Sequence, residues 1–173
     1  FVGSRGLGDV YKRQVLDGIP ISIKDLADIK GKLTGGGSSL TNKEKARNNA
    51  TFVDNLQNQG AIILGKTHMT ELAFSGLGLN PITATPTNPF NEELVSGGSS
   101  SGSAVSVSRN YCFASIGSDT GGSVRIPAAW NNLVGLKTTH NLIDLKGVLK
   151  LCPSFDTLGP VSYTHLTLPT IVS

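Results

Sequence analysis

The chain has 173 residues, 38% of them hydrophobic, with a formal net charge of +3 and two cysteines. This length suits one domain with a real core, and no run of about 18 apolar residues is present to cross a membrane. The positive charge forms no basic stripe and only 6% of the residues are aromatic, which argues against nucleic-acid binding. Cys112 and Cys152 provide neither a disulfide framework nor a metal-ligand spacing, and this favours a reducing, cytoplasmic compartment.

The apolar residues predict strands that alternate with helices. A β-branched run over residues 19–23 predicts a strand that leads into Lys24, residues 50–60 carry the apolar stripe of a helix, and residues 61–64 read as a fully buried strand. Further along we expect a helix from residue 67, a proline-rich loop over 80–90, a helix over 101–108, a strand over 111–116, a loop over 117–123, and an apolar run over 133–136 followed by irregular chain to residue 160. The alternation indicates an α/β protein with a largely buried sheet.

The two ends of the chain do not fit this pattern. Residues 1–14 and 162–173 show neither the helix nor the strand period, and they resemble translated sequencing-adaptor read-through. We therefore expect both ends to be non-native or disordered, with the fold contained in residues 15–161.

One glycine-bounded segment matches the pattern of a phosphate-binding P-loop. Residues 60–67 read Gly-Ala-Ile-Ile-Leu-Gly-Lys-Thr, which satisfies the spacing letter for letter. The mechanism requires the four interior residues to be a loop whose amides surround phosphate, whereas these four are apolar and predict a buried strand. We therefore expect no nucleotide site here.

A second segment matches the nucleophile elbow of another hydrolase class. Residues 98–102 place Ser100 at the centre of the Gly-x-Ser-x-Gly pattern, and His140 is available as the late histidine that such an enzyme needs. The preceding apolar run, Leu94-Val95, is short for an elbow strand. A flexible Gly/Ser linker is the other reading, but an apolar helix and strand follow directly.

Two further features are ambiguous when each is taken alone. Gly121 and Gly122 precede Ser123, so consecutive backbone amides could converge on one point as in an oxyanion hole, although a plain turn explains the loop equally well. Lys24 follows an apolar strand, where it is either a desolvated base or an ordinary strand-end lysine.

Taken together, these segments resemble the amidase signature family. The resemblance runs from about residue 15 to residue 161 and rests on motifs at Gly18–Asp25, Gly65–Glu71, Asn88-Pro89, Gly97–Ser103, Gly117–Ala129, Gly135–Lys137 and Phe155–Pro160. It implies a mixed β-sheet flanked by helices, which this chain contains only in part because the family is much longer.

The resemblance also implies a Ser–Ser–Lys mechanism for hydrolysing amides. Ser123 corresponds to the nucleophile, and Ser99, held on a cis peptide bond, passes the proton of Ser123 to Lys24. Lys24 must be neutral to act as the base; burial favours the neutral form, and Asp25 opposes it if its carboxylate points inward.

Supporting residues follow from the same correspondence. The oxyanion hole is assigned to the amides of Thr120, Gly121, Gly122 and Ser123, with support from Ser100 and from the pair Asp119 and Arg125. This chemistry needs no metal and no organic cofactor. Trp130-Asn131-Asn132 departs from the family pattern, which bears on the range of substrates more than on the reaction class.

Three functions are open at this point. The first is an amidase that converts a small carboxamide to an acid and ammonia or an amine, acting without direct nucleic-acid or membrane contact, either alone or as a homo-oligomer. The second is the A subunit of glutamyl-tRNA(Gln) amidotransferase, which works with partner subunits. That subunit usually has Arg-Gln and Asp-Gln where this chain has Arg125-Ile126 and Asp156-Thr157, so the sequence favours the first. The third is a catalytically inactive binding protein.

Overall fold

Five strands form one mixed sheet in the order β2-β1-β3-β5-β4 in the computed structural model, which describes residues 14–41 and 44–163. Strands β2, β1 and β3 are parallel, β5 is antiparallel to β3, and β4 is antiparallel to β5. The strands span β1 (Pro20–Lys24), β2 (Ile62–Thr67), β3 (Ala114–Asp119), β4 (Val134–Gly135) and β5 (Thr157–Ser162). The carboxyl ends of the three parallel strands lie on the same side of the sheet, and ligand sites of α/β proteins form at such carboxyl ends.

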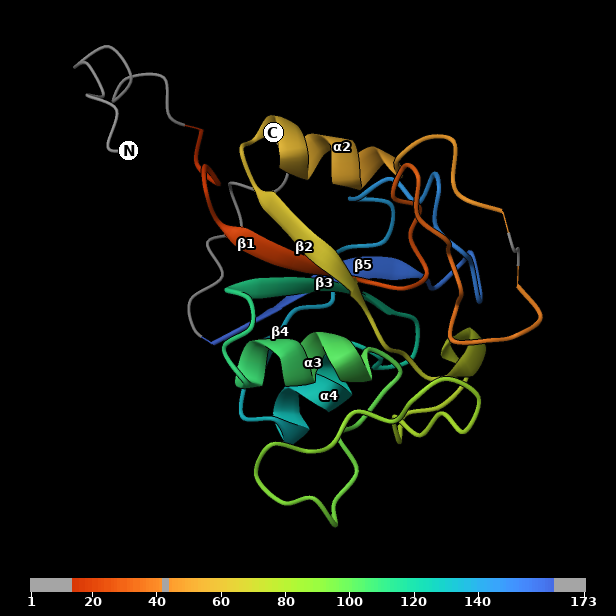
Figure 1. Ribbon diagram of the computed structural model, residues 1–173, viewed down its shortest axis with the longest axis vertical. Coiled ribbons are helices and arrows are strands. Elements are labelled where there is room, and N and C mark those ends of the chain that lie inside the picture. The colour runs from red at the N-terminus through yellow and green to blue at the C-terminus, as the bar shows by residue number, and fades with distance from the viewer. Residues whose placement is uncertain (1–13, 42–43, 164–173) are drawn as a thin grey trace.

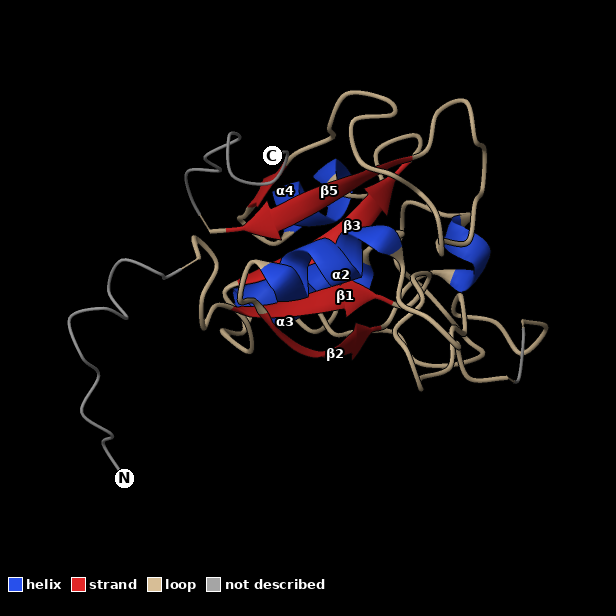
Figure 2. Ribbon diagram, turned by 90° about the horizontal axis from the view of Figure 1, so that it is seen from above, coloured by secondary structure: helices blue, strands red, loops and turns tan. Residues whose placement is uncertain are grey.

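Helices cover both faces of this sheet, which confirms the predicted α/β class (Figures 1 and 2). Helix α2 (Thr51–Asn58) lies on one face, and α3 (Ser101–Ser108) and α4 (Arg125–Trp130) lie on the other. A 3-10 turn, η1 (Glu71–Ala73), follows β2. Helices α2 and α3 connect the parallel strands, as the βαβ arrangement requires.

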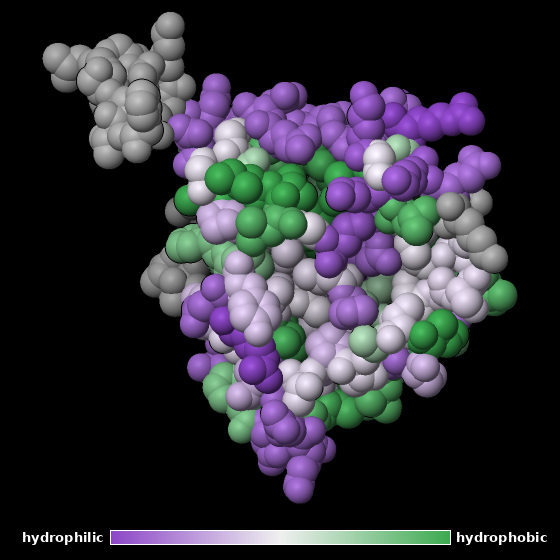
Figure 3. Space-filling model, viewed as in Figure 1, coloured by the Kyte–Doolittle hydropathy of each residue, from purple (hydrophilic) through white to green (hydrophobic). Residues whose placement is uncertain are grey.

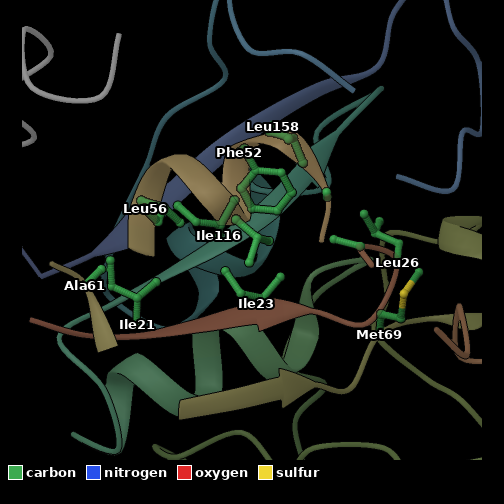
Figure 4. Packing of buried hydrophobic residues seen from close by; sticks show 12 residues of the cluster. Ile21, Ile23, Leu26, Phe52, Leu56, Ala61, Met69, Ile116 and Leu158 are labelled. Carbon is green, nitrogen blue, oxygen red and sulfur yellow. The ribbon is translucent and has the colours of Figure 1, made fainter. Parts of the chain in front are cut away.

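The main hydrophobic core lies between α2 and the sheet (Figure 4). The apolar stripe of α2 packs against inward-facing side chains of β1, β3 and β5, and burial of each large side chain contributes roughly 1.5–3 kcal/mol. The cluster includes Phe52, Val53, Leu56, Ile21, Ile23, Ile116 and Leu158. On the opposite face a smaller cluster joins Ala104, Val124, Ala128 and Val161, where small side chains let α3 and α4 approach the sheet closely.

The alternation of side chains along β1 divides it between these two faces. Ile21 and Ile23 belong to the core under α2. Ser22 faces the other way, because its hydroxyl lies 3.1 Å from the hydroxyl of Ser106 in α3. Lys24 is two residues after Ser22, so the period of two directs it to the α3 face as well. The pattern that builds the core therefore also orients the lysine.

The prediction of a fully buried strand over residues 61–64 was wrong. β2 is an edge strand of the described sheet, and the side chains of Ile62 and Leu64 are 52% and 53% exposed. Ile63, which alternates with them, packs against the core. Apolar surface lies beneath the hydrophilic band formed around α2 in the space-filling view (Figure 3). The apolar run was read correctly as a strand, but one of its two faces is uncovered.

Other boundaries also differ from the sequence expectations. β3 begins at Ala114 and continues to Asp119, and β5 occupies part of the segment expected to be irregular. The helix expected from residue 67 is only the turn η1, because Leu72 and Ala73 adopt positive φ values of 47° and 61°, which end regular helix.

The expected non-native ends lie largely outside the described residues. At the C-terminal boundary, β5 includes Ser162, and the hydroxyl of Tyr163 donates to the carbonyl oxygen of Ser108 at 2.6 Å. Within residues 14–41 and 44–163, none of the helices has the length and apolar character needed to span a membrane.

Candidate active site

Lys24 lies at the carboxyl end of β1 with only 1% of its surface exposed. Its Nζ donates to the hydroxyl of Ser99 at 2.7 Å and to the hydroxyl of Ser118 at 2.9 Å. Neither partner is charged, so among the described residues the ammonium form has no direct ion pair. This is the environment in which a lysine loses its proton most readily.

Burial lowers the pKa of Lys24 from 10.5 to about 7, although the carboxylates of Asp119 and Asp156 act in the opposite direction. Asp25, the other candidate to oppose the neutral form, instead accepts hydrogen bonds from Lys66 Nζ at 2.7 Å and from the backbone N–H of Gly35. Burial therefore acts toward the neutral form of Lys24, and the carboxylate of Asp25 is engaged by other groups.

Ser99 is held in a tight loop just before α3. The peptide bond between Gly98 and Ser99 is cis, and the Ser99 side chain is fully buried. A Cβ on Gly98 would lie 2.6 Å from the hydroxyl of Thr70 and 2.8 Å from the carbonyl oxygen of Ser75, so the close approach requires glycine here. The loop thereby brings Ser99 to the lysine.

Ser123 lies in the connection between β3 and α4, beside the Ser99 loop. Its carbonyl oxygen accepts a hydrogen bond from the backbone N–H of Ser100 at 3.1 Å, which ties the residue after Ser99 directly to Ser123. The Ser123 side chain is half-buried, and its hydroxyl has no hydrogen-bond partner among the residues that the structure describes. The structure therefore joins the side chains of Lys24 and Ser99 directly, and it links the backbone of Ser123 to the same loop.

The loop after β3 curls around the carboxylate of Asp119, which is completely buried. Oδ1 accepts the backbone N–H of Gly122 at 2.9 Å, and Oδ2 accepts that of Val124 at 3.2 Å. The side chain of Arg125 adds two hydrogen bonds of 3.0 Å. Burial alone would raise the pKa of Asp119, but these hydrogen bonds lower it to about 2, so the group stays ionised.

This arrangement distinguishes the backbone amides of the loop from one another. The N–H of Gly122 is engaged by Asp119. The N–H groups of Thr120, Gly121 and Ser123 have no acceptor within the described part of the chain. Backbone N–H groups without an acceptor are the kind of donor that an oxyanion site uses.

Several polar residues of the site were not singled out by the sequence. Ser118 accepts a hydrogen bond from Lys24, and Asp156 accepts one of 2.5 Å from the hydroxyl of Thr120. Lys137 Nζ donates to backbone carbonyl oxygens of the loop after β3. Each lies inside a segment that carried the family resemblance, but their contacts join strands that are distant in sequence.

A pocket of about 250 Å³ opens beside these residues. Ser118, Thr120 and Asp156 line it together with mostly aliphatic side chains, among them Leu26, Met69, Leu72, Leu145, Val148, Leu149 and Leu151. A largely apolar pocket with a few polar groups in its lining is typical of a small-molecule site.

The P-loop pattern and the nucleophile-elbow pattern, the two alternative motifs, lack the surroundings that their mechanisms require. The interior of the P-loop pattern is strand, as predicted, although β2 extends through Lys66 and Thr67. Lys66 Nζ is bound by Asp25 and by the carbonyl oxygen of Leu33. Ser100 is fully buried and donates to the carbonyl oxygen of Ser118 at 3.3 Å, while His140 is exposed. Over the described ranges, no three His, Cys, Asp or Glu side chains are grouped in a way that could hold a metal ion.

Comparison with known proteins shows the family to which the chain belongs. The profile of the Amidase family matches residues 6–167. The chain belongs to the amidase family. The glutamyl-tRNA(Gln) amidotransferase A subunit of Desulfotalea psychrophila is 45% identical over 149 residues, which cover 86% of this chain and 31% of that protein. The chain thus spans about a third of the length of the curated relatives it matches.

Solved structures of amidases share the fold. The native peptide amidase from Stenotrophomonas maltophilia superposes with a TM-score of 0.83 at 36% identity, covering 91% of this chain and 33% of its own. Another solved amidase gives a TM-score of 0.83 at 39% identity, with 88% and 35% covered. The mixed sheet and its helices are therefore part of the amidase fold.

Proposed function

We propose that the enzyme carrying this chain hydrolyses a carboxamide through an acyl-enzyme on Ser123, with Ser99 as the proton relay and Lys24 as the base. The observation that carries the proposal is the buried Lys24, whose Nζ lies 2.7 Å from the Ser99 hydroxyl and whose pKa is lowered to about 7. A general base with a pKa near the working pH is the most effective one.

The proposed reaction has two halves. Ser123 Oγ attacks the amide carbonyl carbon while its proton passes to Ser99 Oγ, and the proton of Ser99 passes to Lys24 Nζ. The protonated lysine then returns a proton through Ser99 to the leaving nitrogen, so the C–N bond breaks and ammonia or an amine departs. Water attacks the acyl-enzyme with the same base, releasing the acid and restoring Ser123.

The negative charge that develops on the carbonyl oxygen needs hydrogen-bond donors. The unengaged N–H groups of Thr120, Gly121 and Ser123 support this role. Gly122, Asp119 and Arg125 contribute by ordering the loop, since the N–H of Gly122 binds the Asp119 carboxylate and Arg125 holds that carboxylate in place. Ser100 joins the two loops through its N–H to Ser123.

The lining of the pocket supports a substrate with an apolar acyl group. Most side chains around it are aliphatic, and Lys150 and Asp156 are its charged members. Glutamine would bring a charged amino group and a charged carboxylate, which an apolar wall binds poorly. The aliphatic majority of the lining therefore supports a general amidase, whereas Lys150 and Asp156 would be the partners of the charged groups of glutamine.

The A subunit of glutamyl-tRNA(Gln) amidotransferase is the second candidate, and the 45% identity to one such protein is the observation that favours it. In that case the chain would act with partner subunits. Ammonia release from glutamine only in the presence of companion subunits, with none from simple carboxamides, would favour this candidate.

The experiment for the main proposal is a set of alanine variants in a full-length enzyme that carries this segment. Ser123→Ala and Lys24→Ala should each lower kcat for a simple carboxamide by about 10⁴-fold or more, since members of a catalytic unit fail together. Ser100→Ala should cost about tenfold, in keeping with the loss of one hydrogen bond. Near-normal rates in Lys24→Ala together with a large loss in His140→Ala would instead favour the nucleophile-elbow mechanism.

A further inference from the structure

Lys137 follows β4 and directs its ammonium group at the backbone behind the proposed oxyanion site. Its Nζ donates to the carbonyl oxygen of Asp119 at 2.5 Å, of Thr120 at 3.1 Å and of Phe155 at 2.9 Å. It also lies 3.4 Å from Asp119 Oδ1. A lysine ammonium has three N–H donors, so three carbonyl oxygens can use all of them.

Two of these carbonyls belong to peptide units that matter for the chemistry. The carbonyl of Asp119 shares its peptide unit with the N–H of Thr120, and the carbonyl of Thr120 shares its unit with the N–H of Gly121. In a trans peptide the oxygen and the N–H point in opposite directions, so Lys137 approaches each unit from the side away from its N–H. Neither N–H has an acceptor among the described residues.

A cation at the oxygen of a peptide unit draws electron density away from its nitrogen. The N–H then becomes a stronger donor, and hydrogen bonds in such chains strengthen one another by roughly 10–30% each. The hydroxyl of Thr157 also donates to the carbonyl oxygen of Asp119, at 3.0 Å, and so acts in the same direction.

We propose that Lys137 is a positioning residue that polarises the peptide units of Thr120 and Gly121 and so strengthens their hydrogen bonds to the oxyanion. It acts through the backbone and does not contact the substrate. The inference rests on the proposed function, because it takes these two N–H groups as oxyanion donors.

The expected signature is a loss of kcat without a loss of substrate binding. A single oxyanion donor is worth about 10²–10³ in rate, so weakening two of them without removing either should lower kcat about tenfold. The ground-state carbonyl oxygen carries less charge than the oxyanion, so KM should stay within about twofold.

The experiment compares Lys137→Gln, which removes the charge, with Lys137→Arg, which keeps it, in a full-length enzyme containing this segment. An alkyl boronic acid is the probe of the charged state, because it forms an anionic tetrahedral adduct with a nucleophilic serine. Lys137→Gln should weaken boronic acid binding about tenfold, in parallel with kcat. Lys137→Arg should recover a large part of both. Lys146→Gln removes an exposed cation from the same segment and is the matched control, with kcat and boronic acid affinity unchanged.

Four outcomes decide the proposal. A parallel fall in kcat and boronic acid affinity with recovery in Lys137→Arg supports it. Unchanged kcat and boronic acid affinity in Lys137→Gln, or a rise in KM alone, overturns it while the proposed function stands. If Lys137→Gln does not fold, Lys137→Met takes its place in the same comparison, because it also removes the charge while keeping a long side chain, and unchanged boronic acid affinity in that variant overturns the proposal. Hydrolysis that survives in Ser123→Ala overturns the proposed function and this inference together.

Discussion

Lys24 differs from the other lysines of the site in having no carboxylate within hydrogen-bonding distance among the described residues. Lys66 is paired with Asp25, and Lys137 lies near Asp119. Burial therefore dominates the pKa of Lys24, and two hydroxyls rather than a carboxylate receive its hydrogen bonds. Because its pKa is lowered, Lys24 can lose its proton to solvent near neutral pH, and no second side chain is needed to deprotonate it.

The first prediction concerns the pH profile. Because the pKa of Lys24 is lowered to about 7 and the neutral form is the base, kcat/KM should rise with pH up to about 7 and level off above it. Asp156 raises the pKa of Lys24, so Asp156→Asn should move the rising limb to lower pH. Steady-state rates between pH 5 and pH 9 measure both, and a limb that does not move or that moves to higher pH would contradict this electrostatic account.

The sequence predicted the site residues that lie within its motifs. It did not predict those whose role depends on a side-chain contact between distant segments. Lys24, Ser99 and Ser123 lie in motifs that the sequence shows directly. Ser118 in β3 accepts a hydrogen bond from Lys24 in the neighbouring strand β1. Lys137 binds carbonyl oxygens from two separate segments. Such contacts depend on strand register, which periodicity alone does not determine.

At the scale of elements, the sequence predicted α2 and β2 from their apolar residues and α3 from its run of small residues. The stripe of α2 and the apolar run of β2 are clear in the sequence, whereas β5 contains Gly159 and Pro160, both unfavourable in strands. The exposure of β2 could not be predicted, because a run of apolar residues looks the same at the centre and at the edge of a sheet. Helix α4 is short and contains Pro127, so it gives little periodic signal.

The second prediction tests how α3 is seated. Gly102 in α3 lies against the backbone of His68, and an added Cβ would be 2.5 Å from His68 N and 2.7 Å from His68 O. Gly102→Ala should therefore destabilise the fold by about 1–3 kcal/mol, as overpacking does. It should also displace Ser99, which precedes the helix, and lower kcat.

Gly121→Ala is the matched control for stability, because nothing lies within 4 Å of the position its Cβ would take. Its free energy of unfolding should stay within about 0.5 kcal/mol of the parent value. Urea unfolding of both variants makes the comparison. Equal stability in Gly102→Ala and the parent would show that α3 does not depend on this close contact.

At the scale of the whole molecule, the chain covers about a third of the length of its relatives and leaves apolar surface on β2. Edge strands with apolar side chains pair readily with other chains. The third prediction is that the 173 residues expressed alone aggregate and show no amidase activity, although Lys24 and Ser99 are in place. A soluble monomer with a sharp thermal transition and amidase activity would contradict it.

Replacing exposed side chains of β2 tests the cause of that aggregation. Ile62→Lys and Leu64→Lys place charges on the exposed face and should raise the soluble fraction. Ile63→Lys places a charge against the core and should lower it. Soluble yield after centrifugation compares the three, and equal yields would show that the edge of β2 is not responsible.

The most direct measurement of the central claim is to locate the covalent adduct formed by an alkyl fluorophosphonate in a full-length enzyme that carries this segment. The reagent modifies a serine only where a base activates it. Mass spectrometry of the digested protein should find the adduct on Ser123, absent in Ser123→Ala and slowed at least about 10³-fold in Lys24→Ala. An adduct on Ser100 that depends on His140, or full hydrolytic activity in Ser123→Ala, would contradict the account.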